Sequence, residues 1–200
     1  MGTGRPTRTI PAHGMKWRCI PEFAPTVPLL DVDRLRRPGQ LSPSELVKDS
    51  TTRTVARIPD PSNPAGPGLY VKRYKFRDLR DRVRYRFVPS KPRKEWRICR
   101  ALQQRGIPTC DVLAIAVRHR WGLPCEGFLV SRELTDTFTL KEFLSGEFPA
   151  MAEKQPDLRR ELTVELAALT ARLVDARFYH HDYHAGNLLV RPEAAPGERL

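Results

Sequence analysis

The stretch His180–Asn187 reads HHDYHAGN and is followed directly by the apolar run Leu188-Leu189-Val190. A histidine lies two positions before Asp182, and an asparagine lies five positions after it. This order is typical of the catalytic loop of phosphotransferases, in which the aspartate accepts the proton of a substrate hydroxyl and the asparagine holds Mg²⁺ against the phosphates of ATP. The loop therefore predicts ATP-dependent phosphoryl transfer, with Asp182 as the catalytic base and Asn187 as a metal ligand.

The histidines of this loop carry two further predictions and one alternative. His180 is expected to hold the loop by hydrogen bonds, and His184 is expected to donate to the transferring phosphoryl group. The alternative is a metal site made of His180, His181, Asp182 and His184. The sequence offers no second cluster of ligands with fixed spacing, which disfavours that alternative.

A cation for the ATP phosphates is predicted far upstream of the loop. Lys72 lies in the centre of a predicted strand at Leu69–Tyr74, between apolar and aromatic residues. Glu95 lies in the first turns of the next predicted helix, from which it can reach back to pair with Lys72. Both residues could instead be ordinary members of a charged surface. The order of Lys72, Glu95 and Asp182 along the chain favours the functional interpretation.

Hydrophobic periodicity predicts a mixed α+β chain. Alternating residues indicate strands over 45–48, 52–58, 69–74, 112–117 and 127–134, and 3.6-residue periodicity indicates helices over 92–104, 139–144 and 158–177. Residues 1–43 hold seven of the 19 prolines with little periodicity. They are therefore predicted to form a loosely ordered N-terminal arm.

Composition restricts the class of protein and of partner. An apolar content of 40% excludes wholesale disorder, and no apolar run is long enough to span a membrane. The four cysteines form no C-x-x-C pair, which indicates reduced thiols in a cytoplasmic protein. The net charge of +12 is concentrated in residues 72–105, which contain 14 Lys and Arg residues but only three acidic residues. Such a field attracts nucleic acid, anionic lipid or a phosphorylated substrate, so a basic binding module stays open as an alternative.

From residue 45 to residue 190 the chain resembles the lipopolysaccharide core kinases, the Kdo and heptose kinases of Gram-negative bacteria. The matching pieces are Tyr70–Tyr74, the helix with Glu95 and Trp96, the turn Arg105–Pro108, the strand Phe128–Leu134 and the loop His180–Asn187. The resemblance implies a protein-kinase-like fold, with an antiparallel N-lobe sheet and one helix over 44–134 and the start of a helical C-lobe over 135–200. It also implies that backbone groups of Glu133 and Leu134 meet adenine at a hinge between the lobes.

The resemblance further implies the reaction and its partners. The cofactors would be ATP and Mg²⁺, and the acceptor would be a sugar hydroxyl of an anionic glycolipid such as lipopolysaccharide core. A cytoplasmic location follows, with peripheral contact to the anionic inner face of the membrane. Kinases of aminoglycosides, of other small molecules or of proteins share the fold and remain alternatives, whereas a nucleic-acid partner is disfavoured.

The chain departs from the pattern of the family at two places. The stretch Asp49–Thr52 between the first two predicted kinase strands contains no glycine, so a glycine-rich phosphate cover is missing. Arg191–Leu200 contains Glu193 and Glu198 but no aspartate to bind the Mg²⁺ that bridges the phosphates. We therefore expect the chain to be a fragment of a longer kinase and, taken alone, to be inactive.

Overall fold

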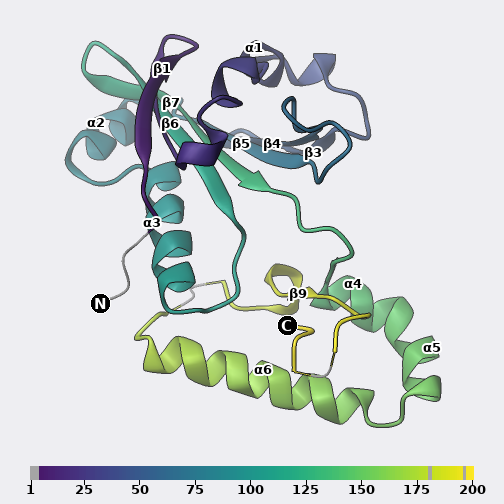
Figure 1. Ribbon diagram of the computed structural model, residues 1–200. Coiled ribbons are helices and arrows are strands. Elements are labelled where there is room, and N and C mark those ends of the chain that lie inside the picture. The colour runs from purple at the N-terminus through teal and green to yellow at the C-terminus, as the bar shows by residue number, and fades with distance from the viewer. Residues whose placement is uncertain (1–4, 180–181, 196) are drawn as a thin grey trace. The chain divides into compact units, whose positions relative to one another are not determined.

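The computed structural model describes residues 5–179, 182–195 and 197–200 (Figure 1). The chain divides into two compact units. Unit 1 comprises the residues up to Gln104 together with Thr109–Glu133, and unit 2 comprises Arg105–Pro108 together with Leu134–Leu200. Each unit is described by itself below.

Unit 1 is built on a sheet of seven antiparallel strands. In spatial order they are β1 (Arg8–Ala12), β2 (Met15–Cys19), β6 (Val112–Arg120), β7 (Leu123–Arg132), β5 (Leu69–Lys75), β4 (Arg53–Ile58) and β3 (Leu46–Asp49). The strands expected between residues 45 and 134 are all present, and the predicted α+β class with an antiparallel sheet is confirmed. Strands β1 and β2 were not expected.

Alternation along the central strands gives the sheet two buried faces. On β7, Phe128 and Val130 belong to one apolar cluster, whereas Leu129 belongs to another on the opposite face. On β5, Val71 joins the first cluster and Tyr74 the second. Because successive side chains of a strand point to opposite faces, Lys72 lies on the same face as Tyr74.

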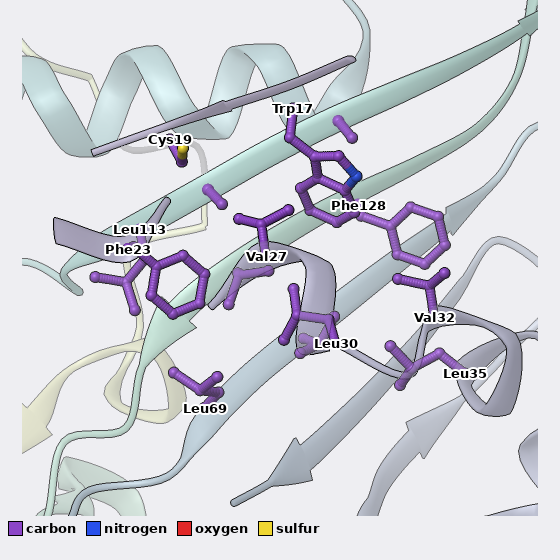
Figure 2. Packing of buried hydrophobic residues seen from close by; sticks show 14 of the residues in the cluster. Trp17, Cys19, Phe23, Val27, Leu30, Val32, Leu35, Leu69, Leu113 and Phe128 are labelled. Carbon is purple, nitrogen blue, oxygen red and sulfur yellow. The ribbon is translucent and has the colours of Figure 1, made fainter. Parts of the chain in front are cut away.

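The prediction of a loosely ordered arm over residues 1–43 is wrong for the described part of this segment. After β1 and β2 come the 3₁₀ helices η1 (Pro21–Phe23), η2 (Val27–Leu29) and η3 (Pro38–Gln40) and the short helix α1 (Val32–Arg36). Apolar side chains of η1, η2, α1 and β2 cover one face of the sheet (Figure 2). Trp17 is fully buried, and its ring centroid lies 5.8 Å from that of Phe128.

The prolines that suggested disorder in this segment serve as helix starts. Each of the three 3₁₀ helices has a proline in one of its first two positions. The missing N–H of proline costs nothing there because the first amides of a helix have no partner within it. The prolines therefore mark the starts of short helices, and large apolar residues between the prolines belong to the core.

Helix α1 is also fixed to the sheet by charge. The carboxylate of Glu126, on β7, is almost fully buried and accepts hydrogen bonds from Arg36 Nη2 at 2.7 Å and from Arg73 Nε at 2.6 Å. A buried carboxylate requires such partners because its desolvation is costly. The two arginines thus serve the structure of unit 1.

The second face of the sheet is covered by the helices that follow β5. Helix α3 (Lys91–Gln104) buries Trp96, Cys99 and Leu102, the stripe expected from the sequence. Helix α2 (Leu79–Phe87) was not expected and buries none of its residues.

Unit 2 consists mainly of helices. These are α4 (Leu140–Ser145), α5 (Glu147–Lys154) and α6 (Leu158–Asp175), with a small sheet of β8 (Phe138–Thr139) and β9 (Leu189–Val190). Its core contains Leu140, Phe143, Leu158, Leu162 and Val190.

A buried glutamate of α6 holds the last residues of the chain. Glu165 accepts hydrogen bonds from the amides of Gly197, Arg199 and Leu200, at 2.6, 2.9 and 3.0 Å. These contacts satisfy both the carboxylate and the amides of a segment without regular structure. Nothing in the periodicity of α6 marked Glu165, which stands among the leucines of the predicted stripe.

Candidate active site

Lys72 and Glu95 form the ion pair that the sequence predicts. Lys72 lies on β5 between Val55 of β4 and Leu129 of β7, and its ammonium donates to Glu95 Oε1 on α3. Both side chains are about three-quarters buried, with exposed fractions of 25% and 28%. Partial burial strengthens the attraction because less water screens the two charges.

Tyr74 is a member of this site that the sequence analysis did not identify. Its hydroxyl donates to Glu95 Oε2, so both carboxylate oxygens of Glu95 are held from β5. Burial raises the pKa of Tyr74, and the negative charge of Glu95 raises it further. The hydroxyl thus stays protonated and remains a donor. The available signal was the spacing of two between Lys72 and Tyr74, which places them on one face of the strand.

Two cysteines lie beside the ion pair. Cys99 follows Glu95 by one turn of α3, and its Sγ lies 3.5 Å from Sγ of Cys110. The hydrogen bond from Cys99 lowers the pKa of Cys110, burial opposes this shift, and the positive charge of Lys72 lowers the pKa further, to about 7. For Cys99 the same hydrogen bond and burial raise the pKa.

Alkylation of Cys110 should therefore become fast at lower pH than alkylation of an ordinary thiol. A depressed pKa means that the reactive thiolate is present above about pH 7 in the folded protein and is lost as the pH falls below that value. Cys99→Ala removes the donor and should move the midpoint of the pH–rate profile upward. Peptide-resolved mass spectrometry after timed iodoacetamide treatment measures the midpoint. An unchanged midpoint in Cys99→Ala would show that the cysteine pair does not set it.

Glu133 and Leu134 lie where unit 1 ends and unit 2 begins. The Glu133 amide donates to Gly68 O at 2.8 Å, and its carboxylate accepts from Gly68 N at 3.0 Å and from Arg57 Nε at 2.5 Å. Leu134 O accepts from the hydroxyl of Thr137 at 2.9 Å. The Glu133 amide is therefore already hydrogen-bonded to Gly68, the residue before β5. Contact of Glu133 and Leu134 with adenine stays a prediction.

In unit 2 the loop brings together Asp182, His184 and Asn187. Asn187 Nδ2 donates to the backbone oxygen of Asp182 and to its Oδ2, both at 2.9 Å. His184 Nε2 lies 3.1 Å from Asp182 Oδ1. The Asp182 carboxylate is thus oriented by both neighbours, while 75% of its side chain is exposed.

The contacts of His184 define its tautomer. Nδ1 accepts a hydrogen bond from the Gly186 amide at 3.0 Å, so this nitrogen carries a lone pair. The proton of the neutral ring is then on Nε2, which donates to Asp182. The predicted role of donating to a phosphoryl group would require this nitrogen to leave Asp182. In the observed arrangement His184 positions Asp182.

The loop is fixed at two points to the rest of unit 2. The hydroxyl of Tyr183 lies 2.8 Å from that of Thr170 on α6. After the 3₁₀ helix η4 (Ala185–Asn187), Leu188 O accepts from the Leu140 amide at 2.8 Å, and β9 pairs with β8. The predicted anchoring role of His180, and the place of His181, lie outside the described residues.

The amide oxygen of Asn187 is the atom of this loop suited to Mg²⁺. Because Nδ2 is used on Asp182, Oδ1 is the Asn187 atom that would offer Mg²⁺ the hard oxygen ligand it prefers. Among the described residues no three His, Cys, Asp or Glu side chains gather into a metal-binding group.

The turn between β3 and β4 contains no glycine, and its polar side chains form hydrogen bonds within the turn and with the neighbouring strands. Ser50 Oγ donates to Arg53 O at 2.9 Å, and Asp49 Oδ1 accepts from Thr54 Oγ1 at 2.7 Å and from Lys75 Nζ at 2.5 Å. These hydrogen bonds lower the pKa of Asp49. The turn is therefore held by side chains rather than shaped by glycine.

The fold and the site can be compared with those of known proteins. A solved structure described as WaaP in complex with acyl carrier protein is similar with a TM-score of 0.48 and 19% sequence identity, over 83% of this chain and 56% of that chain. No curated protein sequence matches significantly. The model of the lipopolysaccharide kinase (Kdo/WaaP) family matches residues 41–200, which include every site residue described above. The chain belongs to the Kdo/WaaP lipopolysaccharide kinase family.

Proposed function

We propose that this protein transfers the γ-phosphoryl group of ATP to a sugar hydroxyl of lipopolysaccharide core or of a similar glycoconjugate. The observation that carries the proposal is the contact between Lys72 and Glu95, residues 23 positions apart that meet across a strand and a helix. An ammonium held in this way is suited to the α and β phosphates of ATP. Membership of the lipopolysaccharide kinase family supports the choice of acceptor.

The loop of unit 2 would act on the acceptor. Asp182 would accept the proton of the attacking hydroxyl, since its carboxylate is exposed and oriented. His184 would hold that carboxylate through Nε2, and the Asn187 oxygen would bind Mg²⁺. When bound, Mg²⁺ neutralises charge on the phosphates. Backbone groups of Glu133 and Leu134 would contact adenine.

A second magnesium ligand is not assigned. Residues 191–200 contain no aspartate, and Glu193 and Glu198 stand in a segment rich in turns. The first test of the proposal is therefore nucleotide binding, which depends on Lys72 and not on a second metal ligand.

Nucleotide binding tests the proposal directly. Lys72→Met should raise the dissociation constant for ATP about 10- to 100-fold, because a hydrogen bond to a charged group contributes about 1.5–3 kcal/mol. Lys16→Met is the matched control, since Lys16 lies on β2 of the same unit and is exposed. Isothermal titration calorimetry with MgATP gives both constants. Equal dissociation constants for the two variants would show that Lys72 does not bind the nucleotide. Absence of ATP binding by the wild-type protein would contradict the proposed function.

A further inference from the structure

Helix α2 carries its apolar residues on the face that points away from the protein. Leu79, Val83 and Phe87 recur every four residues and therefore form one stripe along the helix. Their exposed fractions are 65%, 43% and 81%. A surface helix of a globular protein normally turns such a stripe toward the core. An exposed apolar stripe of this kind indicates an interaction surface.

The orientation of α2 is fixed by contacts with the sheet and with the hairpin between β6 and β7. The ring of Tyr85 packs on that of Phe76, with 5.3 Å between the centroids. Arg82 Nε donates to Pro124 O at 3.2 Å, and Arg86 Nη1 donates to Gly122 O at 2.9 Å. Aromatic and polar contacts thus hold the helix on the sheet.

Arginines border the apolar stripe. Arg80 and Arg84 each follow a stripe residue by one position and lie along one edge, and Arg86 lies along the other. Arg80, Arg84 and Arg86 are exposed. Asp81 is partly buried and Asp78 at the start of the helix is exposed, so the three exposed arginines outnumber the exposed carboxylate on the outer surface.

The hairpin between β6 and β7 extends this surface. Its two-residue turn consists of Trp121 and Gly122, both with positive φ (52° and 74°), and the side chain of Trp121 is 83% exposed. The guanidinium of Arg120 lies 4.5 Å from the centre of the Trp121 ring. Since Arg86 bonds to Gly122, the hairpin tip lies beside α2, as Figure 1 shows. Tryptophan is favoured at the boundary between lipid and water.

We propose that α2 and the tip of the β6–β7 hairpin dock unit 1 on an anionic phospholipid membrane. The arginines would bind lipid phosphates, and Leu79, Val83, Phe87 and Trp121 would enter the interface between headgroups and acyl chains. Among the described residues no helix is long and apolar enough to cross a bilayer. Binding through this surface would be peripheral and would bring a kinase to an acceptor carried by a glycolipid, so the inference rests on the proposed function.

The residue types of the apolar stripe on α2 favour lipid over nucleic acid as the partner. A nucleic-acid surface places its cations and stacking aromatics outermost, whereas the most exposed line of α2 is aliphatic at two of its three positions. An acidic protein with an apolar groove is the other conceivable occupant, and the experiment includes it as an outcome.

Vesicle binding tests this proposal without reference to kinase activity. Sedimentation with phosphatidylcholine vesicles, with and without phosphatidylglycerol, should show binding that requires the anionic lipid and weakens with salt. The triple variant Leu79→Ser, Val83→Ser, Phe87→Ser should lose at least about tenfold in affinity, because each side chain gives up apolar burial. Arg80→Gln and Arg84→Gln should each lower the affinity for anionic vesicles about fivefold.

Matched controls come from the same unit. Leu29→Ser with Val47→Ser removes two exposed apolar side chains elsewhere, and Arg18→Gln with Arg37→Gln removes two exposed charges. Both control proteins should bind vesicles as the wild type does. Trp121 is the exposed tryptophan of the three in the chain, since Trp17 and Trp96 are buried. Its fluorescence should shift to the blue on anionic vesicles, and Trp121→Phe should abolish the shift.

Three results would overturn the docking surface. The first is a triple variant that binds vesicles as tightly as the wild type, and the second is equal binding to vesicles with and without phosphatidylglycerol. The third is absence of vesicle binding, whether or not the same surface binds an acidic protein. Because ATP binding is measured separately, failure here leaves the proposed function untouched.

Discussion

Asp182→Asn is expected to lower the rate of phosphoryl transfer about 10²- to 10⁴-fold, the range typical of a lost general base. The substitution keeps the size of the side chain and removes its capacity to accept the hydroxyl proton. ATP binding should change little, because Lys72 and Glu95 belong to the other unit of the chain. Transfer of labelled phosphate from ATP to lipopolysaccharide core saccharide by the protein measures the effect.

Asp175→Asn is the matched control for this prediction. Asp175 is exposed at the end of α6 in the same unit, and its replacement makes the same change in charge. The control should retain the rate of the wild type. If Asp182→Asn also retained it, Asp182 would not be the base, and its contacts with His184 and Asn187 would serve only the structure of the loop.

Trp17→Ala is expected to reduce the free energy of unfolding of unit 1 by about 3–5 kcal/mol. Trp17 is fully buried against Phe128, and its indole N–H donates to Ala12 O at 3.2 Å. Truncation leaves a large cavity in the main core cluster of the sheet. Urea denaturation followed by circular dichroism measures the loss.

Trp121→Ala provides the comparison, because it removes the same side chain from an exposed position. Its effect should stay within about 0.5 kcal/mol, as for most surface substitutions. Equal stabilities of the two variants would mean that the segment before residue 43 adds little to the core. That result would support the interpretation of this segment as a loosely ordered arm, which its prolines suggest.

Most of the sheet and the main helices of the chain could be predicted from periodicity. Alternation predicted β3 to β7 because one residue in two must face an apolar cluster. The stripe of Trp96, Cys99 and Leu102 predicted α3 for the corresponding reason at a period of 3.6. Helix α2 escaped prediction because its apolar residues do not face the core, and charge dominates its composition.

The candidate site was predicted in part. The catalytic loop and the Lys72–Glu95 pair followed from the types of residue and their order along the chain. Tyr74, the neighbouring cysteine pair and the pairing of Glu133 with Gly68 did not follow, because each depends on which strands are neighbours. Strand register and packing bring such residues together, and the spacing of residues along the chain does not predict either of them.

The sequence by itself determined the family, the strands β3 to β7, the helices α3, α4 and α6 and the residues able to carry the chemistry, because these depend on residue type and local period. Tertiary structure alone decided that the proline-rich start is core and that Glu95 is held on both oxygens. It also decided that α2 shows its apolar stripe to solvent. The reason is physical: burial and hydrogen bonding between distant residues depend on how the faces of strands and helices are matched in space.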